Sequence, residues 1–282
     1  MTTDDPAVAP TDDLADVAVR AVEAGGAYLA DRFADGATDA EYTDQDVKTA
    51  ADREAERRVL SVVDEAYPHH AVSTEERGDR PGTAYRWVID PLDGTNNFAA
   101  GIPTFGVAVT VCERGDDDGG DSAADGAGGE RPVATAVSVP VCDDVYVATR
   151  GGGVRYNGRP VAVTDGDDRP LSAGTVGMVV GQPVLAGGRP RREWDAVTDA
   201  VEGVCKRAIQ TWAPVVYWSL FARGKLDGFV CYYPDEREQV AGELLARGAG
   251  AAERSEGPLT VFGADESVRE GLWMATRDAL AD

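Results

Sequence analysis

The sequence predicts an α+β half followed by an α/β half. Apolar residues recur at helical spacing between residues 14 and 66, and short apolar runs typical of strands follow up to residue 150. After about residue 170, strands alternate with helices, which implies a parallel or mixed sheet covered by helices. We therefore expect residues 14–170 to form the first half and residues 171–282 to form the second.

Two helices open the first half. In residues 14–33 the apolar side chains recur every three to four positions, as in a helix with one buried face. A second helix follows, because Asp46 or Thr49 can cap its start and Pro68 ends it. The acidic residues 1–13 are expected to form a disordered tail ahead of the first helix.

A short strand is expected just ahead of Ser73. Four further strands complete the first half, and the last three are expected to be antiparallel neighbours. They are predicted at residues 86–90, 104–113, 132–139 and 144–150. The segment 114–131 is rich in Gly and Asp and too polar to pack, so we expect a flexible insertion between two of these strands.

The second half alternates between the two kinds of element. Pro214 stands where the first position of a helix favours proline. Strands are predicted at residues 174–181, 206–210, 226–233 and 258–262. Helices are predicted at residues 193–204, 214–224, 236–248 and 266–281.

The charge of the chain excludes several partners. Asp and Glu number 50 against 27 Lys and Arg, which gives a net charge of −23 over 282 residues. A field of that sign repels nucleic-acid phosphates and anionic lipid headgroups, so we expect neither nucleic acid nor a membrane as a partner. The chain shows no basic leader and no apolar run long enough to span a bilayer, so we expect a cytoplasmic protein.

One segment, residues 90–98, carries the chemistry. Asp90 and Asp93 flank Pro91, which stiffens the backbone, so both carboxylates can converge with the carbonyl of Leu92. Such a set of oxygen ligands suits Mg²⁺ or Mn²⁺ rather than zinc. The residues that follow, Gly94-Thr95-Asn96, open a short helix whose backbone N–H groups can bind a phosphate. A bare β-turn also contains D-P-x-D-G, but the match here is longer and follows a buried strand.

Residues 87–98 resemble the central motif of the inositol monophosphatase family, which belongs with fructose-1,6-bisphosphatases to the Mg²⁺-dependent, lithium-sensitive phosphatases. The family pattern is W-[VI]-[IV]-D-P-[IL]-D-G-T-x-N-F, and Trp87 to Phe98 fit it throughout. Four further segments are similar to other family elements, and the resemblance covers residues 14–255. These segments are residues 46–52, 74–76, 148–161 and 222–229.

The resemblance implies a layered αβαβα sugar-phosphatase fold, a homodimer, and two or three Mg²⁺ ions, or Mn²⁺, in each site. It implies that Glu75, which otherwise fits a solvated acidic turn, joins Asp90, Asp93 and the Leu92 carbonyl as a metal ligand. Gly94, Thr95 and Asn96 would bind the phosphate, and Asp52 would orient the Thr95 hydroxyl. A metal-activated water positioned by Glu75 and Thr95 would attack phosphorus without a covalent intermediate.

The second half departs from the family pattern where the substrate is chosen. Glu238 takes the place of an Asp that ligates the second metal and touches the substrate, although Asp235 in the same loop is an alternative ligand. Trp212-Ala213 replaces a Gly-Ser pair, where Trp212 either stacks on a base or packs in the core. The family's acid that binds inositol hydroxyls aligns with Cys231, and a Lys of another family element aligns with Glu41. These departures make recognition of myo-inositol the open part of the resemblance.

Three functions remain open on the sequence. The first is a Mg²⁺-dependent phosphomonoesterase for inositol-1-phosphate or fructose-1,6-bisphosphate, and the second is a nucleotide phosphatase for 3′-phosphoadenosine 5′-phosphate or NADP. The third is a family member that binds metal without turnover. His69 and His70 have no part in these functions and are expected at the surface.

Most of the acids are left over once the chemistry is assigned. The chain has 32 Asp, 18 Glu and only three Lys, and the site uses about five acids. We interpret the remainder as an adaptation to a salt-rich cytoplasm, as in a halophilic archaeon, because dissolved ions screen self-repulsion.

Overall fold

The computed structural model describes residues 9–36, 40–42, 47–114, 130–167 and 169–281. The chain divides into an N-terminal unit, Met1–Gly152, and a C-terminal unit, Gly153–Asp282. This division falls earlier than the boundary that the sequence predicted after residue 170. Strands alternate with helices only from about residue 175 onward. The hairpin and short turns that precede this point do not show the alternating pattern, so the sequence did not indicate that they belong to the C-terminal unit.

The N-terminal unit contains a sheet with the strand order β8-β7-β6-β5-β3-β4. β3 runs parallel to β5, and the other neighbours are antiparallel, as predicted for the last three strands. The strands are β3 (His70–Thr74), β4 (Gly78–Arg80), β5 (Thr83–Asp93), β6 (Gly106–Arg114), β7 (Glu130–Val139) and β8 (Asp144–Thr149). Residues 115–129, most of the expected insertion, lie outside the described residues.

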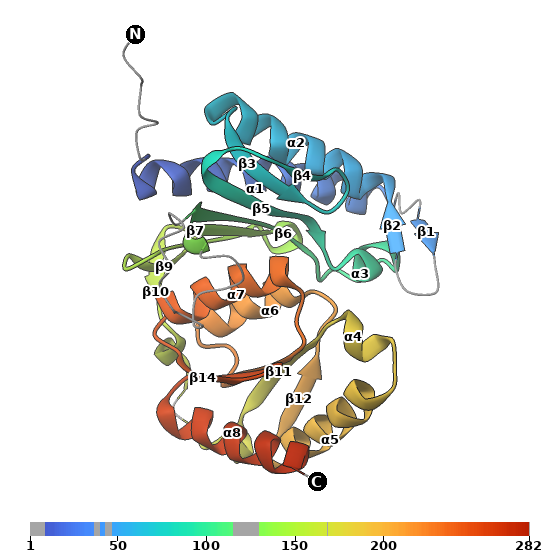
Figure 1. The fold of residues 1–282 in the computed structure, drawn as a ribbon, viewed down its shortest axis with the longest axis vertical. Helices are drawn as coiled ribbons and strands as arrows, with labels where there is room; N and C mark the ends of the chain where they lie inside the picture. Colours follow the sequence, from blue (N-terminus) through green and yellow to red (C-terminus); the bar gives the residue numbers. More distant parts are fainter. Residues whose placement is uncertain (1–8, 37–39, 43–46, 115–129, 168, 282) are drawn as a thin grey trace. The chain divides into compact units, whose positions relative to one another are not determined.

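Helices α1 (Thr11–Ala34) and α2 (Ala50–Ala66) cover one face of this sheet (Figure 1). α1 begins within the segment expected to be a tail, because Asp12 and Asp13 in its first turn favour a helix N-terminus. Of that segment, residues 1–8 are outside the described part of the chain. The core between these helices and the sheet includes Leu14, Val22, Leu29, Val59, Trp87, Phe98 and Phe105.

Thr49 caps α2, one of the two caps that the sequence allowed. Its hydroxyl accepts hydrogen bonds from the N–H groups of Ala51 and Asp52, and the Asp52 carboxylate accepts one from the Thr49 N–H. This reciprocal pair is a capping box, which the sequence Thr49-x-x-Asp52 permits. Two short strands precede it, β1 (Ala40–Tyr42) and β2 (Val47–Thr49), and they pair with each other.

The C-terminal unit opens with an antiparallel hairpin of β9 (Gly153–Tyr156) and β10 (Arg159–Val161). Its five-stranded sheet has the order β12-β11-β13-β15-β14, and β11, β12 and β13 are parallel, so the predicted mixed sheet is confirmed. The strands are β11 (Thr175–Val180), β12 (Arg207–Gln210), β13 (Gly228–Tyr232), β14 (Ala252–Glu256) and β15 (Leu259–Gly263).

Helices cover both faces of the second sheet. α6 and α7 lie on one face, and α5 and α8 lie on the other (Figure 1). The helices of this unit are α4 (Gln182–Leu185), α5 (Arg189–Val204), α6 (Pro214–Ala222), α7 (Glu236–Gly248) and α8 (Glu266–Ala281). Among the described residues, 3₁₀ turns stand at Val163–Asp165 and Leu171–Ala173 of this unit and at Pro140–Cys142 of the N-terminal one. No helix in the described part of the chain has the length and apolar character to cross a bilayer.

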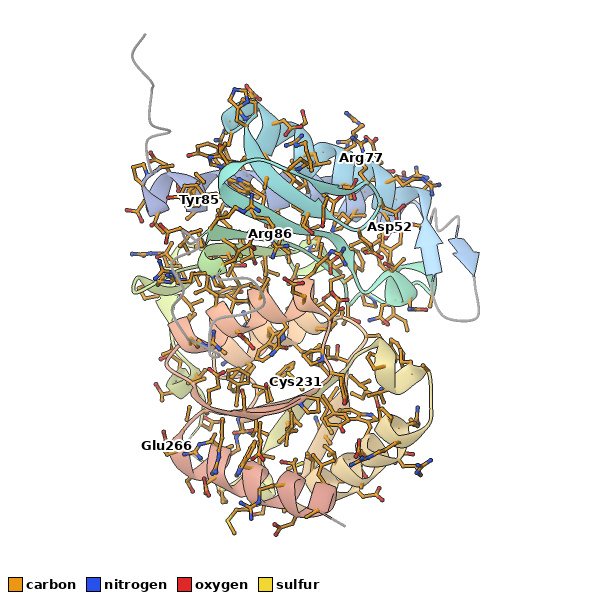
Figure 2. The ribbon with its side chains drawn as sticks, in the orientation of Figure 1. Asp52, Arg77, Tyr85, Arg86, Cys231 and Glu266 are labelled. Carbon is orange, nitrogen blue, oxygen red and sulfur yellow. The ribbon has the colours of Figure 1, made fainter. Side chains whose placement is uncertain are left out.

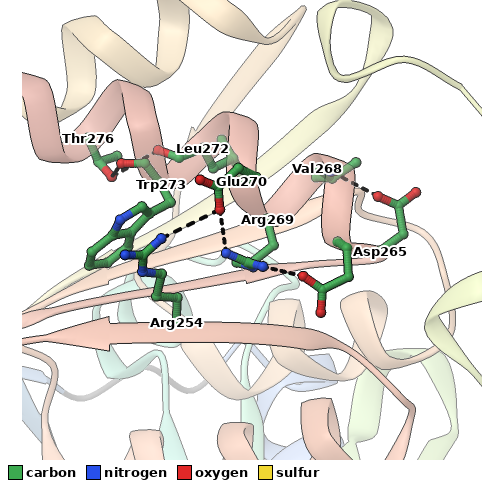
Figure 3. Close-up of polar contacts among 9 residues, drawn as sticks. Arg254, Asp265, Val268, Arg269, Glu270, Leu272, Trp273 and Thr276 are labelled. Atoms are coloured by element: carbon green, nitrogen blue, oxygen red, sulfur yellow. Dashed lines mark hydrogen bonds and ion pairs between the residues drawn. The ribbon is translucent and has the colours of Figure 1, made fainter.

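Strand β14 was not predicted, because its sequence is mostly charged and gives no apolar alternation. It is an edge strand, and its contacts with α8 hold it in place (Figure 3). The Arg254 guanidinium lies 4.5 Å from the centre of the Trp273 ring and 3.5 Å from the Glu270 carboxylate. The charged side chains of β14 therefore contact the helix α8, and such a contact cannot be predicted from the local sequence.

His70 belongs to an aromatic cluster, so the prediction that it is a surface residue was wrong. Its ring stacks on Tyr67 with 4.5 Å between ring centres, and its Nδ1 accepts a hydrogen bond from Trp87 Nε1 at 3.0 Å. The parallel pairing of β3 with β5 brings Trp87 beside it, a contact between residues distant in the sequence. His69 is exposed, as expected.

We expect His70 to make the stability of the N-terminal unit depend on pH. Burial and the neighbouring His69 lower the pKa of His70 below its ordinary value of 6.5. The unfolded chain therefore takes up this proton first, so stability is full above about pH 6.5 and falls as the pH drops through the folded-state pKa. In His70→Asn, the amide oxygen can still accept a hydrogen bond from Trp87, but the side chain does not titrate. The part of the acid-induced loss of stability that comes from residue 70 should therefore be absent. Urea unfolding from pH 7.5 to pH 5 compares the two proteins, with His69→Asn as the exposed control.

Candidate metal and phosphate site

A β-bulge in β5 brings two acids together. Asp90 pairs with Ala108 and Asp93 with Gly106, so four residues of β5 lie opposite three residues of β6. In a regular strand, residues three apart point to opposite faces, and one extra residue turns them to the same side. Pro91 suits this place, because it cannot donate a ladder hydrogen bond and occurs in sheets at bulges. Asp90 and Asp93 each offer an oxygen within 4.8 Å of the other.

The donor atoms at the bulge fit a hard cation. Asp90 is 7% exposed and Asp93 is 3% exposed, so both carboxylates are largely withdrawn from water. Burying two like charges so close together costs free energy that a cation offsets. The Leu92 carbonyl lies between them in sequence, and the resulting set of oxygens suits Mg²⁺ or Mn²⁺. The residues present therefore fit the metal that the sequence predicted.

Gly94 turns the chain from the strand into the short helix α3, Thr95–Ala99. Its φ of +90° lies in the left-handed region, and its carbonyl accepts the first helical hydrogen bond, from Phe98 N–H at 2.9 Å. Asn97 then fixes this helix to the following loop, since its amide donates to the carbonyl and hydroxyl of Thr104. The predicted short helix is confirmed.

The Thr95 hydroxyl lies between two acceptors. Its Oγ is 3.1 Å from Asp52 Oδ1 and 2.9 Å from the Leu92 carbonyl oxygen. Asp52 Oδ2 accepts hydrogen bonds from the N–H and the hydroxyl of Thr49, both at 2.6 Å, so the carboxylate is held in one orientation. Burial raises the pKa of Asp52 above its ordinary value, against the lowering effect of these hydrogen bonds. The predicted contact between Asp52 and Thr95 is therefore present.

Glu75 follows β3 and is exposed. Thr74 pairs with Ile89 in the parallel ladder, so Glu75 and Asp90 both come one residue beyond that pair. Strands that run parallel carry such residues to the same edge of the sheet. Glu75 is thus at the same edge of the sheet as Asp90, and its role as a ligand stays a prediction.

The C-terminal unit carries the remaining predicted site residues. Glu238 lies in the first turn of α7 and is half-buried, whereas Asp235 caps that helix by accepting a hydrogen bond from Arg237 N–H at 3.0 Å. Trp212 is 49% exposed, so it is not a core residue, while Ala213 is buried. That Glu238 rather than Asp235 completes a metal site stays a prediction, supported by the use of Asp235 as a cap.

Cys231, the position that aligns with a hydroxyl-binding acid of the family, lies inside the C-terminal sheet. Cys231 lies within β13 and is fully buried, and burial raises the pKa of its thiol well above the ordinary value. Side chains in the middle of a covered strand face helices rather than a ligand. The side chain of Glu41, the other departing position, lies outside the described residues.

One residue near the site was missed. Glu56 is fully buried on α2, and its carboxylate contacts the turn that follows Glu75. The signal was available, because an acid four residues after Asp52 falls on the buried face of the same helix.

The fold and this site define a class of protein, one in which two buried acids precede a strand-to-helix turn with the oxygen donors and N–H groups suited to a cation and a phosphate. A model of the inositol monophosphatase family matches residues 11–262, and the chain belongs to that family.

Named relatives are similar over most of the chain. Inositol-1-monophosphatase of Rhizobium meliloti is 33% identical over 210 residues, 73% of this chain and 70% of that protein. Fructose-1,6-bisphosphatase/inositol-1-monophosphatase of Aquifex aeolicus is 29% identical over 241 residues and covers 83% of both chains. Nus factor SuhB of Escherichia coli K12 is 28% identical over 244 residues, 83% of this chain and 82% of that protein. A crystal structure of the extragenic suppressor protein suhB from Bartonella henselae has a TM-score of 0.80 at 22% identity, covering 94% of this chain and 98% of that one, which confirms the fold.

Gly94 provides a test of the strand-to-helix turn. In Gly94→Ala the side chain is forced into the left-handed region, which should lower the free energy of unfolding by about 1–2 kcal/mol. The added methyl group also stands where a phosphate would approach, so phosphate binding should weaken. The control is Gly257→Ala, at an exposed left-handed position with open space around it. Chemical denaturation should show similar losses for both variants, whereas phosphate binding, followed by calorimetry in Mg²⁺, should weaken only in Gly94→Ala.

Proposed function

We propose that the protein is a Mg²⁺-dependent phosphomonoesterase that hydrolyses a small sugar or polyol phosphate. The observation that carries this proposal is the bulge of β5, which turns Asp90 and Asp93 to one side directly before the Gly94 turn. Cation ligands and a phosphate-binding turn in one short segment are what hydrolysis of a phosphate ester requires. Inositol-1-phosphate and fructose-1,6-bisphosphate are the leading substrates, in line with the names of the Rhizobium and Aquifex relatives.

The residues have separate tasks in this proposal. Asp90, Asp93, the Leu92 carbonyl and Glu75 hold the metal, and Glu238 adds a ligand for a second ion. When bound, Mg²⁺ neutralises phosphate charge, stabilises the leaving oxygen and makes water a stronger nucleophile at neutral pH. The N–H groups of the first turn of α3, which have no acceptor within the helix, bind the phosphate together with Gly94.

Thr95 and Asp52 form a pair that orients water. When the Thr95 hydroxyl donates its proton to Asp52 Oδ1, its lone pairs are available to accept a hydrogen bond from a water molecule. The raised pKa of Asp52 makes its carboxylate a better proton acceptor than an exposed Asp. Because Thr49 fixes the other carboxylate oxygen, the hydroxyl keeps this orientation.

Trp212 supports the second candidate, a nucleotide phosphatase for 3′-phosphoadenosine 5′-phosphate or NADP. Half of its surface is exposed, and an exposed indole can stack on a nucleobase. The third candidate is a role without turnover, since several relatives carry the name Nus factor SuhB. The net charge of −23 disfavours direct binding to nucleic acid.

We also propose, from family membership, a homodimer in the cytoplasm. The excess of acids over bases supports the further hypothesis of a salt-rich cytoplasm.

Mg²⁺-dependent phosphate release from a panel of substrates tests the proposal. The panel contains inositol-1-phosphate, fructose-1,6-bisphosphate, 3′-phosphoadenosine 5′-phosphate and NADP, each with Mg²⁺ or EDTA and at low and high salt. We expect release from a sugar or polyol phosphate and a loss of at least about 100-fold in Asp93→Asn. Asp79→Asn, an exposed acid of β4, is the control and should keep full activity.

Each other outcome supports a different function. Turnover of only the adenine nucleotides, reduced in Trp212→Ala, supports the nucleotide phosphatase. Mg²⁺ binding without release from any substrate contradicts the enzymatic proposal and supports the member without turnover.

A hydroxyl series at residue 95 tests the orienting pair. Thr95→Ala removes the hydroxyl and should lower kcat by about 10²-fold or more, whereas Thr95→Ser keeps it and should retain most of kcat. Steady-state kinetics on the best substrate of the panel gives kcat and KM separately. Equal loss in both variants would show that the methyl group, rather than the hydroxyl, is needed.

A further inference from the structure

We propose that Glu56 is a positioning residue that fixes the turn carrying Glu75 and thereby strengthens metal binding. This inference rests on the proposed function, in which Glu75 is a metal ligand. Glu56 has no place in the water-orienting pair, yet its carboxylate is fully buried on α2.

Both carboxylate oxygens of Glu56 face the turn between β3 and β4. Oε2 accepts a hydrogen bond from the backbone N–H of Glu76 at 2.9 Å, and Oε1 lies 3.3 Å from Arg77 Nε. Arg77, labelled in Figure 2, is itself 58% exposed, whereas Glu56 is fully buried, so the guanidinium is the partner on the solvent side. Oε1 forms no hydrogen bond with the described residues, and the ion pair is therefore its principal compensation.

A buried carboxylate persists only if its partners compensate for the lost water. A hydrogen bond from an N–H to a charged carboxylate is stronger than one between neutral groups, and a nearby guanidinium adds the attraction of the opposite charge. Both partners of Glu56 come from the two residues directly after Glu75, so the compensation is gained only when that turn lies against α2. The burial of Glu56 therefore selects one position of the turn.

The turn is also closed at its base. Thr74 pairs with Gly78 across β3 and β4, and the Thr74 hydroxyl donates to the Gly78 carbonyl at 3.2 Å. Glu75 is thus flanked by Thr74, which pairs with Gly78, and by Glu76, whose N–H contacts α2. Its own side chain is exposed, and the backbone of the turn sets the point from which that side chain extends.

Glu56 follows Asp52 by four residues on the same helix. Side chains at this spacing lie on one face, one turn apart. Asp52 holds Thr95 at the end of β5, and Glu56 holds the turn at the end of β3. One face of α2 therefore places two separate segments of the proposed site, and partners that orient a metal ligand commonly contribute 10- to 100-fold in affinity.

A double-mutant cycle with Mn²⁺ as the probe tests this inference. The dissociation constant of Mn²⁺, measured by electron paramagnetic resonance, is compared in the unmodified protein, Glu56→Gln, Glu75→Gln and the double variant. We expect Glu56→Gln to weaken binding by about 10-fold or more in the unmodified protein. In the Glu75→Gln background the same change should have little further effect, because Glu56 acts through Glu75.

Two further variants separate positioning from stability. Glu54→Gln alters an exposed ion pair with Arg57 on the same helix and should leave Mn²⁺ affinity unchanged. Arg77→Gln changes an exposed side chain and leaves Glu56 in place, and it should weaken Mn²⁺ binding in the same direction as Glu56→Gln, by a smaller factor. Thermal unfolding by circular dichroism establishes that each variant is folded.

The outcomes are distinct. Equal losses of affinity from Glu56→Gln in both backgrounds, or none in either Glu56→Gln or Arg77→Gln, would overturn the positioning role. If Glu75→Gln binds Mn²⁺ normally, the ligand assignment fails and the inference with it. The proposed function is judged separately, by phosphate release in Asp93→Asn.

Discussion

The carboxylate of Asp52 is the group on which the site most depends. It closes the capping box at the start of α2, and its other oxygen accepts a hydrogen bond from the Thr95 hydroxyl. Helix caps of this kind contribute about 1 kcal/mol to the free energy of unfolding. The side chain that begins the helix also fixes a residue of the site. A substitution at Asp52 therefore changes stability and chemistry together, whereas Thr95 can be changed without disturbing the cap.

The second constraint is the proline between the two acids. A regular strand cannot present residues three apart on one side, and an antiparallel ladder needs the N–H that Pro91 lacks. Both difficulties are met by the same bulge, which adds one residue and interrupts the ladder there. Gly94 then allows the chain to enter α3 with a left-handed residue. The backbone geometry of this short motif therefore determines how its ligand side chains are arranged.

Much of this could be predicted from the sequence, because the decisive signals are local. The convergence of Asp90 and Asp93, the Thr49 cap and the α3 turn each depend on segments of no more than nine residues, and their residue types indicate them. The position of His70 beside Trp87, strand β14 and the role of Glu56 depend on contacts between distant segments. Local patterns carry no information on such pairs. The charged edge strand shows this most clearly, because its Arg and Glu residues predict a loop until α8 is placed against them.

Burial also separates the functional acids from the acidic coat. Most of the 50 acids serve no site, and at the surface salt screens their repulsion. A few are buried, and some of these have partners within their unit: Glu56 has a backbone N–H and Arg77, and Asp227 has the Thr175 N–H at 2.7 Å and Arg169 at 3.0 Å. The carboxylates of these pairs are buried, so changes in ionic strength act chiefly on the coat. Asp90 and Asp93 differ in that each has the other's carboxylate as a close neighbour, an arrangement that a divalent cation stabilises. The acids that matter for function are thus distinguished by where the fold buries them rather than by their number.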